Sequence, residues 1–167
     1  MIPCGLFIVP IPNNQLRSEA IQQIKQQLFG ARLSHTSEGR PCLSGSEGQS
    51  VSISHSQHWL VAYVASSTSG AVGVDIEEKA DQASRVLERI TTEEERWVMA
   101  RCSVTPLHLW TAKEAVYKAY SDRLSKGITQ IFIVDKNSFE VQCDSGEVLL
   151  QKVTWLEGDG FVIAHTS

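Results

Sequence analysis

Hydrophobic and polar positions change their spacing several times along the chain, and each change marks a predicted element. The apolar stretch from Met1 to Pro10 predicts a first strand. A helix is expected next, because Asn13-Asn14 supply an N-cap and Gly30 is placed to end it. Its apolar residues recur at helical spacing: Leu16, Ala20, Ile21, Ile24 and Leu28. The stretch from Ser34 to Ser50 is rich in Ser, Gly and charge and predicts an exposed loop.

The central part of the chain predicts three short strands followed by two helices. The strands are expected at 51–54, 59–65 and 71–77, most simply as a three-stranded antiparallel meander. Thr91 and Thr92 each have Glu three residues on, which predicts a capping box at the start of a helix through Arg101. Thr105-Pro106 fits the N-cap and first position of a second helix, which reaches about Tyr120.

The last third of the chain alternates apolar runs with turn signals and predicts a β meander. The runs are 128–134, 139–143, 148–156 and 161–164. Strand, helix and strands therefore occur twice in the same order. We expect an α+β fold of two similar lobes related by a pseudo-twofold axis, each a small antiparallel sheet packed on a helix. Residues 1–70 would form a shortened N-terminal lobe and residues 71–167 a C-terminal lobe.

Composition and charge narrow the class of protein. With 167 residues, 42% of them hydrophobic, the chain is long enough to bury a core without disulfides. Its four cysteines form no Cys-x-x-Cys pair, which favours reduced thiols and a cytoplasmic location. The apolar start is broken by prolines and is shorter than a membrane span, so we expect no membrane attachment. The net charge of -4 argues against nucleic acid as a partner.

Two short segments carry most of the candidate chemistry. The first, Gly73-Val74-Asp75-Ile76-Glu77, points both of its acids to one face if it forms a strand. In the second, from Trp110 to Lys118, Glu114 and Lys118 are four residues apart and hence neighbours on a helix. That helix carries few other polar residues, so we expect it to be largely buried. Buried charges need partners or a chemical role.

A divalent metal would satisfy the acids of both segments. Oxygen ligands would come from Asp75, Glu77 and Glu114. Lys113 and Lys118 would remain free for phosphate groups, which indicates phosphoryl-type chemistry. Each segment alone has a plainer interpretation, as exposed acids ending a strand or as an ordinary i,i+4 ion pair. Their joint occurrence favours a metal site in the C-terminal lobe.

Four segments, in order, resemble the signatures of the 4'-phosphopantetheinyl transferase superfamily, and in particular its single-chain, pseudo-dimeric members that serve peptide and polyketide synthetase carrier proteins. They lie between residues 39 and 118: Gly39-Arg40-Pro41-Cys42-Leu43, Ser52-Ile53-Ser54-His55-Ser56 followed by Trp59, Gly73-Val74-Asp75-Ile76-Glu77, and Trp110-Thr111-Ala112-Lys113-Glu114-Ala115 with Lys118. The resemblance implies an enzyme, a holo-[acyl-carrier-protein] synthase, with its active site at the lobe interface. Such an enzyme transfers the phosphopantetheine arm of coenzyme A to a serine of an apo acyl or peptidyl carrier protein. Mg²⁺ is the implied cofactor and adenosine 3',5'-bisphosphate the implied product.

The resemblance also implies roles for individual residues. Asp75, Glu77 and Glu114 would hold the Mg²⁺. Glu114 would also take the serine proton, and Lys118 would steady the pyrophosphate, so both are implied catalytic residues. Contacts to coenzyme A are implied for Arg40, Ser54, His55, Asp75, Lys113, Glu114 and Lys118.

The shortness of the first lobe keeps alternatives open. Basic residues ahead of Gly39 match the family pattern weakly, with Lys25 and Arg32 as the candidates. A non-catalytic relative that binds coenzyme A or a nucleotide is therefore one alternative. The carboxylates and lysines alone would also permit another metal-dependent phosphoryl or nucleotidyl transferase. Carrier proteins are commonly acidic, so a basic docking patch is expected in the segment that carries Arg85, Arg89, Arg96 and Arg101. Because one chain with two lobes contains the whole cleft, we expect a monomer.

Overall fold

The computed structural model describes residues 2–13, 16–37, 39–45, 48–66, 68 and 70–166. Ten strands are assigned among them: β1 (Gly5–Pro10), β2 (Leu33–His35), β3 (Pro41–Leu43), β4 (Gln49–His55), β5 (Trp59–Ser66), β6 (Val74–Glu77), β7 (Ile131–Asp135), β8 (Ser138–Gln142), β9 (Val148–Gly158) and β10 (Phe161–Thr166). The α-helices are α1 (Arg17–Phe29), α2 (Ala80–Ile90), α3 (Glu93–Cys102) and α4 (Pro106–Tyr120). Short 3₁₀ turns are η1 (Gly30–Arg32), η3 (Ser121–Arg123) and η4 (Gly127–Gln130). The protein is thus of the expected α+β class.

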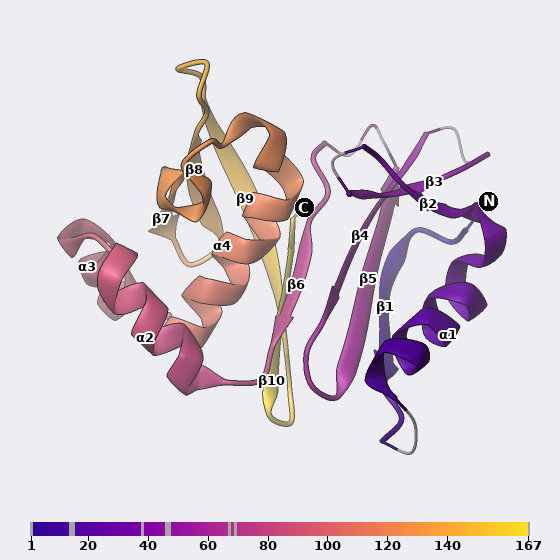
Figure 1. Ribbon diagram of the computed structural model, residues 1–167. Helices are drawn as coiled ribbons and strands as arrows, with labels where there is room; N and C mark the ends of the chain where they lie inside the picture. The colour runs from indigo at the N-terminus through magenta and orange to yellow at the C-terminus, as the bar shows by residue number, and fades with distance from the viewer. Residues whose placement is uncertain are drawn as a thin grey trace.

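The N-terminal half is a small antiparallel sheet with one helix. Its strands are ordered β1-β5-β4, beside a separate β2-β3 hairpin. Helix α1 lies on the side of this sheet that faces away from the rest of the molecule (Figure 1). It buries Ala20, Ile21 and Ile24 against Leu60 of β5. Hydrophobic burial of one helix face therefore holds this half together.

The sequence predicts the C-terminal end of α1 correctly but not its N-terminal end. Gly30 adopts a positive φ of 57° and ends the helix, as expected. The expected cap at Asn13-Asn14 is wrong, because the N-cap position belongs to Leu16, which makes no side-chain hydrogen bond. Asn14 itself lies outside the described residues.

The C-terminal half is a five-stranded antiparallel sheet covered by helices. The strand order is β6-β10-β9-β8-β7, so the predicted closing meander is confirmed. Helix α4 packs on the sheet. Helices α2 and α3 lie on the outer side of α4, farthest from the N-terminal half (Figure 1). Helix α3 begins with the predicted capping box between Thr92 and Glu95, and α4 begins at Pro106 after the Thr105 cap. Both predicted helix starts are confirmed.

Two expectations about the central segment need correction. The three-stranded meander is wrong, because β6 pairs with β10 and not with β5. Both edges of β5 are already paired, one with β1 and the other with β4. Helix α2, which follows β6 directly, was not expected; it buries Ala83 and Leu87.

The two halves meet through an apolar layer. Val61 of β5 packs with Val74 and Ile76 of β6 and with Ile163 of β10. At the edges of this layer the rings of Trp59 and Phe161 lie 5.3 Å apart, and those of Tyr63 and His165 lie 4.3 Å apart. Strands β4 and β6 lie side by side across the junction (Figure 1), where the Val74 N–H donates to Ser52 Oγ. The pseudo-twofold axis and the boundary at residue 70 stay predictions.

Within the described ranges, no helix combines the length and apolar character needed to cross a membrane.

Candidate functional site

Strand β6 divides its side chains between two environments. Val74 and Ile76 enter the apolar layer between the halves. Because side chains alternate along a strand, Asp75 and Glu77 point to the opposite face, toward α4. Asp75 is buried, and Glu77 is partly buried and accepts a hydrogen bond from the Trp110 indole at 3.0 Å. The alternation predicted from the sequence therefore places both acids beside the helix that carries Glu114.

Gly73 allows β6 to approach α4 closely. A Cβ atom at this position would lie 1.9 Å from the Ala115 carbonyl oxygen and 3.0 Å from the Ala119 nitrogen. Any side chain here would push the strand away from the helix backbone. The glycine of the first motif thus sets the distance between the strand acids and the helix charges.

Helix α4 contributes Glu114 and Lys118 to this junction. The buried face of the helix includes Leu109, Ala112, Ala115, Val116 and Ala119, so the prediction of a largely buried helix is confirmed. Lys118 Nζ lies 2.6 Å from Asp75 Oδ1 and 2.8 Å from Ser54 Oγ, and it donates to the Val74 carbonyl at 3.2 Å. The predicted i,i+4 partners are therefore not paired with each other: Lys118 pairs with Asp75 across the strand. Among the described residues, no hydrogen bond or ion pair reaches the Glu114 carboxylate.

The charges at this junction do not balance. Among the described residues, the carboxylates of Asp75, Glu77 and Glu114 share one ammonium group at this junction, that of Lys118. Burial and the neighbouring charge of Asp75, with a smaller effect of Glu77, raise the pKa of Glu114 to about 6. Burial and Asp75 also raise the pKa of Glu77. The site would gain from an additional positive charge.

One buried oxygen points to where such a charge could bind. Asp75 Oδ2 is buried and has no hydrogen-bond partner among the described residues. An unsatisfied buried carboxylate oxygen is costly and is expected to have a ligand. In the part of the chain that the structure describes, no three acidic, His or Cys side chains are already arranged tightly enough to hold a metal. The donor set still suits Mg²⁺, a hard ion that prefers carboxylate oxygens and keeps several waters.

Strand β4 brings Ser54 and His55 to the same junction. Ser54 Oγ donates to Asp75 Oδ1 at 2.7 Å and is also within reach of Lys118. His55, at the end of the strand, accepts a hydrogen bond at Nδ1 from the Arg17 guanidinium at 3.1 Å. Burial, followed by the Arg17 charge, lowers the pKa of His55. A neutral imidazole beside a fixed guanidinium is therefore expected near pH 7.

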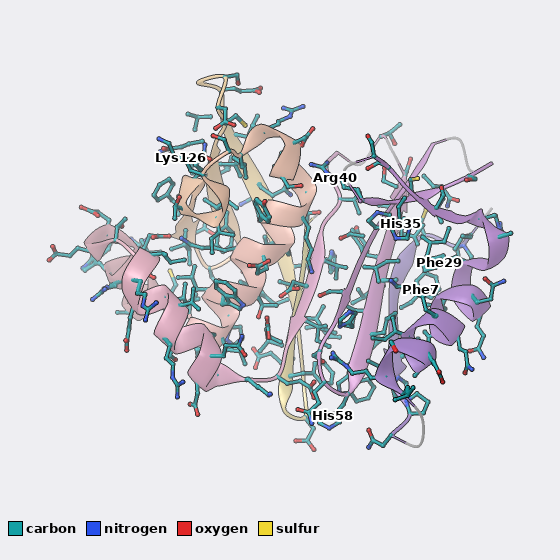
Figure 2. The ribbon with its side chains drawn as sticks, in the orientation of Figure 1. Phe7, Phe29, His35, Arg40, His58 and Lys126 are labelled. Carbon is teal, nitrogen blue, oxygen red and sulfur yellow. The ribbon has the colours of Figure 1, made fainter. Side chains whose placement is uncertain are left out.

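Two cavities open next to Lys118, which lines both. The larger, of about 500 Å³, lies between the halves and is lined by Arg40, Ser52, Tyr117 and Ser121, among others. The smaller, of about 320 Å³, is lined by Lys25, His35, His55 and Ser54, among others. Figure 2 shows Arg40 at the upper end of the junction, with His35 nearby in the N-terminal half and His58 at the far lower end.

The smaller cavity is lined by two basic residues of the N-terminal half, Lys25 and His35, and Arg17 contacts His55 beside it. Lys25 was a weak candidate in the sequence, whereas no sequence signal placed His35 or Arg17 at the site. These residues come from α1 and β2, so only the folded chain gathers them around His55. Arg32, the other weak candidate, does not line either cavity.

The expected role of Lys113 in binding coenzyme A needs correction. Its side chain is only 1% exposed and its Nζ lies 2.7 Å from Glu95 Oε1. Glu95, 2% exposed, also accepts a hydrogen bond from the Ile133 N–H. Lys113 is adjacent to Glu114 in sequence but points to a different side of α4. It links α4 to α3 in the core and is not available to a phosphate.

Comparison with known families places this geometry in context. The family model described as the 4'-phosphopantetheinyl transferase superfamily matches residues 71–164, more than half of the chain. The chain therefore belongs to the 4'-phosphopantetheinyl transferase superfamily, and the resemblance to that superfamily is confirmed. A search of curated proteins finds no match. Membership indicates a transferase of the phosphopantetheinyl type, and the matched region contains Asp75, Glu77, Glu114 and Lys118.

Proposed function

We propose that this protein transfers the 4'-phosphopantetheine arm of coenzyme A to a serine of an apo acyl or peptidyl carrier protein, with Mg²⁺ as cofactor. Family membership supports the class of reaction. The observation that carries the proposal further is the charge imbalance between β6 and α4. Three carboxylates and one ammonium from separate elements meet beside two cavities, and one carboxylate oxygen has no partner among the described residues.

Glu114 is the proposed base. The serine oxygen attacks the phosphorus that carries the pantetheine arm, and the bond from this phosphorus to the bridging oxygen of the pyrophosphate breaks. The serine proton passes to Glu114, and adenosine 3',5'-bisphosphate leaves. A pKa of about 6 suits this task, because the group is mostly ionised near neutral pH yet binds a proton readily.

Mg²⁺ would be held by Asp75, Glu77 and Glu114. When bound, it supplies positive charge between these acids and the pyrophosphate. Lys118, now paired with Asp75, is the protein's own cation at this position and is expected to contact the pyrophosphate. Positioning and charge neutralisation are the main contributions of protein groups to phosphoryl transfer.

The two cavities beside Lys118 supply space for the coenzyme. Their combined lining offers cationic or neutral donors from Arg40, Lys25, His35 and His55 for phosphate oxygens. Ser54 lines the smaller cavity and orients Asp75 and Lys118, because its hydroxyl donates to the carboxylate and accepts from the ammonium. The basic contacts that the N-terminal half matches only weakly in sequence are proposed to come from Lys25 and His35.

The proposal is tested by intact-mass spectrometry of a panel of apo carrier proteins incubated with the protein, coenzyme A and Mg²⁺. We expect at least one carrier to gain the mass of one phosphopantetheine group, and the gain to vanish with a chelator. Glu114→Ala and Lys118→Ala should abolish or strongly slow it. A carrier whose acceptor serine is replaced by alanine is the control for the site of attachment.

If no carrier gains mass, a coenzyme A binding measurement distinguishes the remaining alternatives. Coenzyme A binding without transfer, measured by calorimetry, would favour the non-catalytic relative. Absence of both binding and transfer would contradict the proposed function altogether.

A further inference from the structure

Arg40 joins the two halves through a contact at the rim of the larger cavity. Its guanidinium donates to Asp122 Oδ1 at 2.9 Å and to Ser121 Oγ at 2.7 Å. Arg40 precedes β3 in the N-terminal half, whereas Ser121 and Asp122 form η3 directly after α4. We call this contact, made by Arg40, Ser121 and Asp122, the Arg40 clasp. Figure 2 shows Arg40 reaching toward the end of α4 from the other half.

At this end of the larger cavity, Arg40 is the cation that could bind a ligand, and the clasp already pairs it with Asp122. Arg40 and Ser121 both line the cavity, together with Lys118 and Tyr117 of the last turns of α4. The hydrogen bond from Arg40 lowers the pKa of Asp122, so the carboxylate is ionised at neutral pH. An anionic group that enters the cavity and seeks Arg40 must therefore compete with a carboxylate already bound there.

Because the Arg40–Asp122 pair is exposed, an incoming anion can readily displace Asp122 from Arg40. The Arg40 side chain is 33% exposed and the Asp122 side chain 59% exposed. Exposed pairs of this kind are weak because water and salt screen them. A phosphate dianion offers Arg two charged oxygens in the fork geometry that its guanidinium prefers. The clasp can thus link the two halves and still give way to a phosphate.

The position of Arg40 beside the end of α4 indicates which phosphate of a ligand it would bind. Lys118, the proposed pyrophosphate contact, is followed by Ser121 one helical turn later, roughly 5 Å along the axis. Arg40 bonds to that later turn, beyond the pyrophosphate position. A phosphate monoester set apart from the pyrophosphate, such as the 3'-phosphate of the coenzyme, fits this separation.

We propose that Asp122 is a built-in competitor for Arg40, which is displaced when the 3'-phosphate of the coenzyme binds. The inference rests on the proposed function, because it assigns one end of the same coenzyme site. It makes Asp122 a residue that sets coenzyme affinity and the degree of preference for a 3'-phosphorylated ligand.

The test compares coenzyme A with dephospho-coenzyme A, which lacks the 3'-phosphate, in calorimetric titrations of wild type and Asp122→Asn. Removal of the competing charge should tighten coenzyme A by about two- to five-fold, the value expected for one exposed pair. Dephospho-coenzyme A should bind both proteins equally. Asp159→Asn, in the exposed β9–β10 turn, makes the same change of net charge far from the cavity and should alter neither affinity.

A second variant keeps the inference falsifiable if Asp122 also helps to fold η3. In an Arg40→Gln background, Asp122→Asn should no longer affect coenzyme A affinity. Weaker coenzyme A binding by Asp122→Asn, or an equal gain for both ligands, would overturn the inference and leave the proposed function intact. Absence of coenzyme binding by wild type itself would overturn both.

Discussion

At the scale of single residues, Glu114 lies near two other carboxylates. Its protonation should therefore change the free energy of unfolding. Its folded pKa of about 6 lies above the ordinary 4.5, so the folded state binds the proton more tightly. Stability therefore falls as pH rises through this window. In the presence of a chelator, we expect the free energy of unfolding to drop by about 1 kcal/mol between pH 5 and 7 because of this group. Urea unfolding of wild type and Glu114→Gln at the two pH values measures the difference.

The matched control is Glu94→Gln, on the exposed first turn of α3. That variant should keep the wild-type drop, whereas Glu114→Gln should reduce it and retain only the part contributed by Glu77. Identical pH profiles for wild type and Glu114→Gln would show that Glu114 is not desolvated beside other acids.

Lys118 is the other residue whose loss has a defined consequence. Lys118→Met leaves Asp75 without its ammonium partner, which should lower the free energy of unfolding by about 2 kcal/mol. Asp75→Asn combined with Lys118→Met removes both charges and should recover much of the loss. Chemical denaturation of the two single variants and the double variant gives the coupling. A double variant as unstable as the sum of the single ones would argue against the pair.

Sequence spacing was enough to find the acidic residues and Lys118 of the site, but it did not show where the side chain of Lys113 points. The period of two placed Asp75 and Glu77 on one face, and the helical period placed Glu114 and Lys118 together. Lys113 has a partner, Glu95, on another helix, and no local pattern reveals a partner so far along the chain. The same reason hid the group of basic residues around the smaller cavity.

At the scale of elements, the contact between β6 and α4 depends on Gly73. Gly73→Ala introduces a methyl group within 1.9 Å of a backbone oxygen, so strand and helix must separate. Overpacking of this kind costs about 1–3 kcal/mol. Because the separation also parts Asp75 from Lys118, transfer activity should fall together with the melting temperature.

Gly160→Ala separates this effect from a general cost of replacing glycine. Gly160 has a φ of 81° in the β9–β10 turn, and a Cβ there meets open space. This variant should lose about 1 kcal/mol from backbone strain and keep full transfer activity. Full activity of Gly73→Ala would contradict the role assigned to the β6–α4 contact.

Helix α2 provides a test of carrier docking. Its Arg85 and Arg89 are exposed on the outer side of the C-terminal half. Arg85→Glu with Arg89→Glu should raise the KM for an acidic carrier and weaken the salt dependence of the reaction, with unchanged coenzyme A affinity. Lys126→Glu with Lys136→Glu is a matched double reversal on other exposed loops. Equal carrier kinetics for the two double variants would remove α2 from the docking surface.

The elements themselves show where local patterns succeed and fail. Capping signals fixed the starts of α3 and α4, because a cap is formed by residues a few positions apart. Helix α2 had a readable signal, since Ala83, Val86, Leu87 and Ile90 recur at helical spacing. The pairing of β6 with β10 could not be predicted, because it joins strands almost ninety positions apart.

At the scale of the whole molecule, the apolar layer between the halves places polar groups from both at one junction. Ser54 and Arg40 come from the N-terminal half, and Asp75, Glu114 and Lys118 from the C-terminal half. The α+β class and the family followed from the order of elements and motifs. The way the halves face each other depends on side chains such as Val61 and Ile163, which no motif marks.

The most direct test of the account is the single-turnover rate of phosphopantetheine transfer at saturating coenzyme A, Mg²⁺ and apo carrier, for wild type and Glu114→Gln. The neutral amide keeps the size of the side chain but cannot accept the serine proton. We expect the rate to fall by about 10²- to 10⁴-fold, with coenzyme A still bound. A Glu114→Gln rate within a few-fold of wild type would contradict the assignment of the β6–α4 junction as the catalytic site.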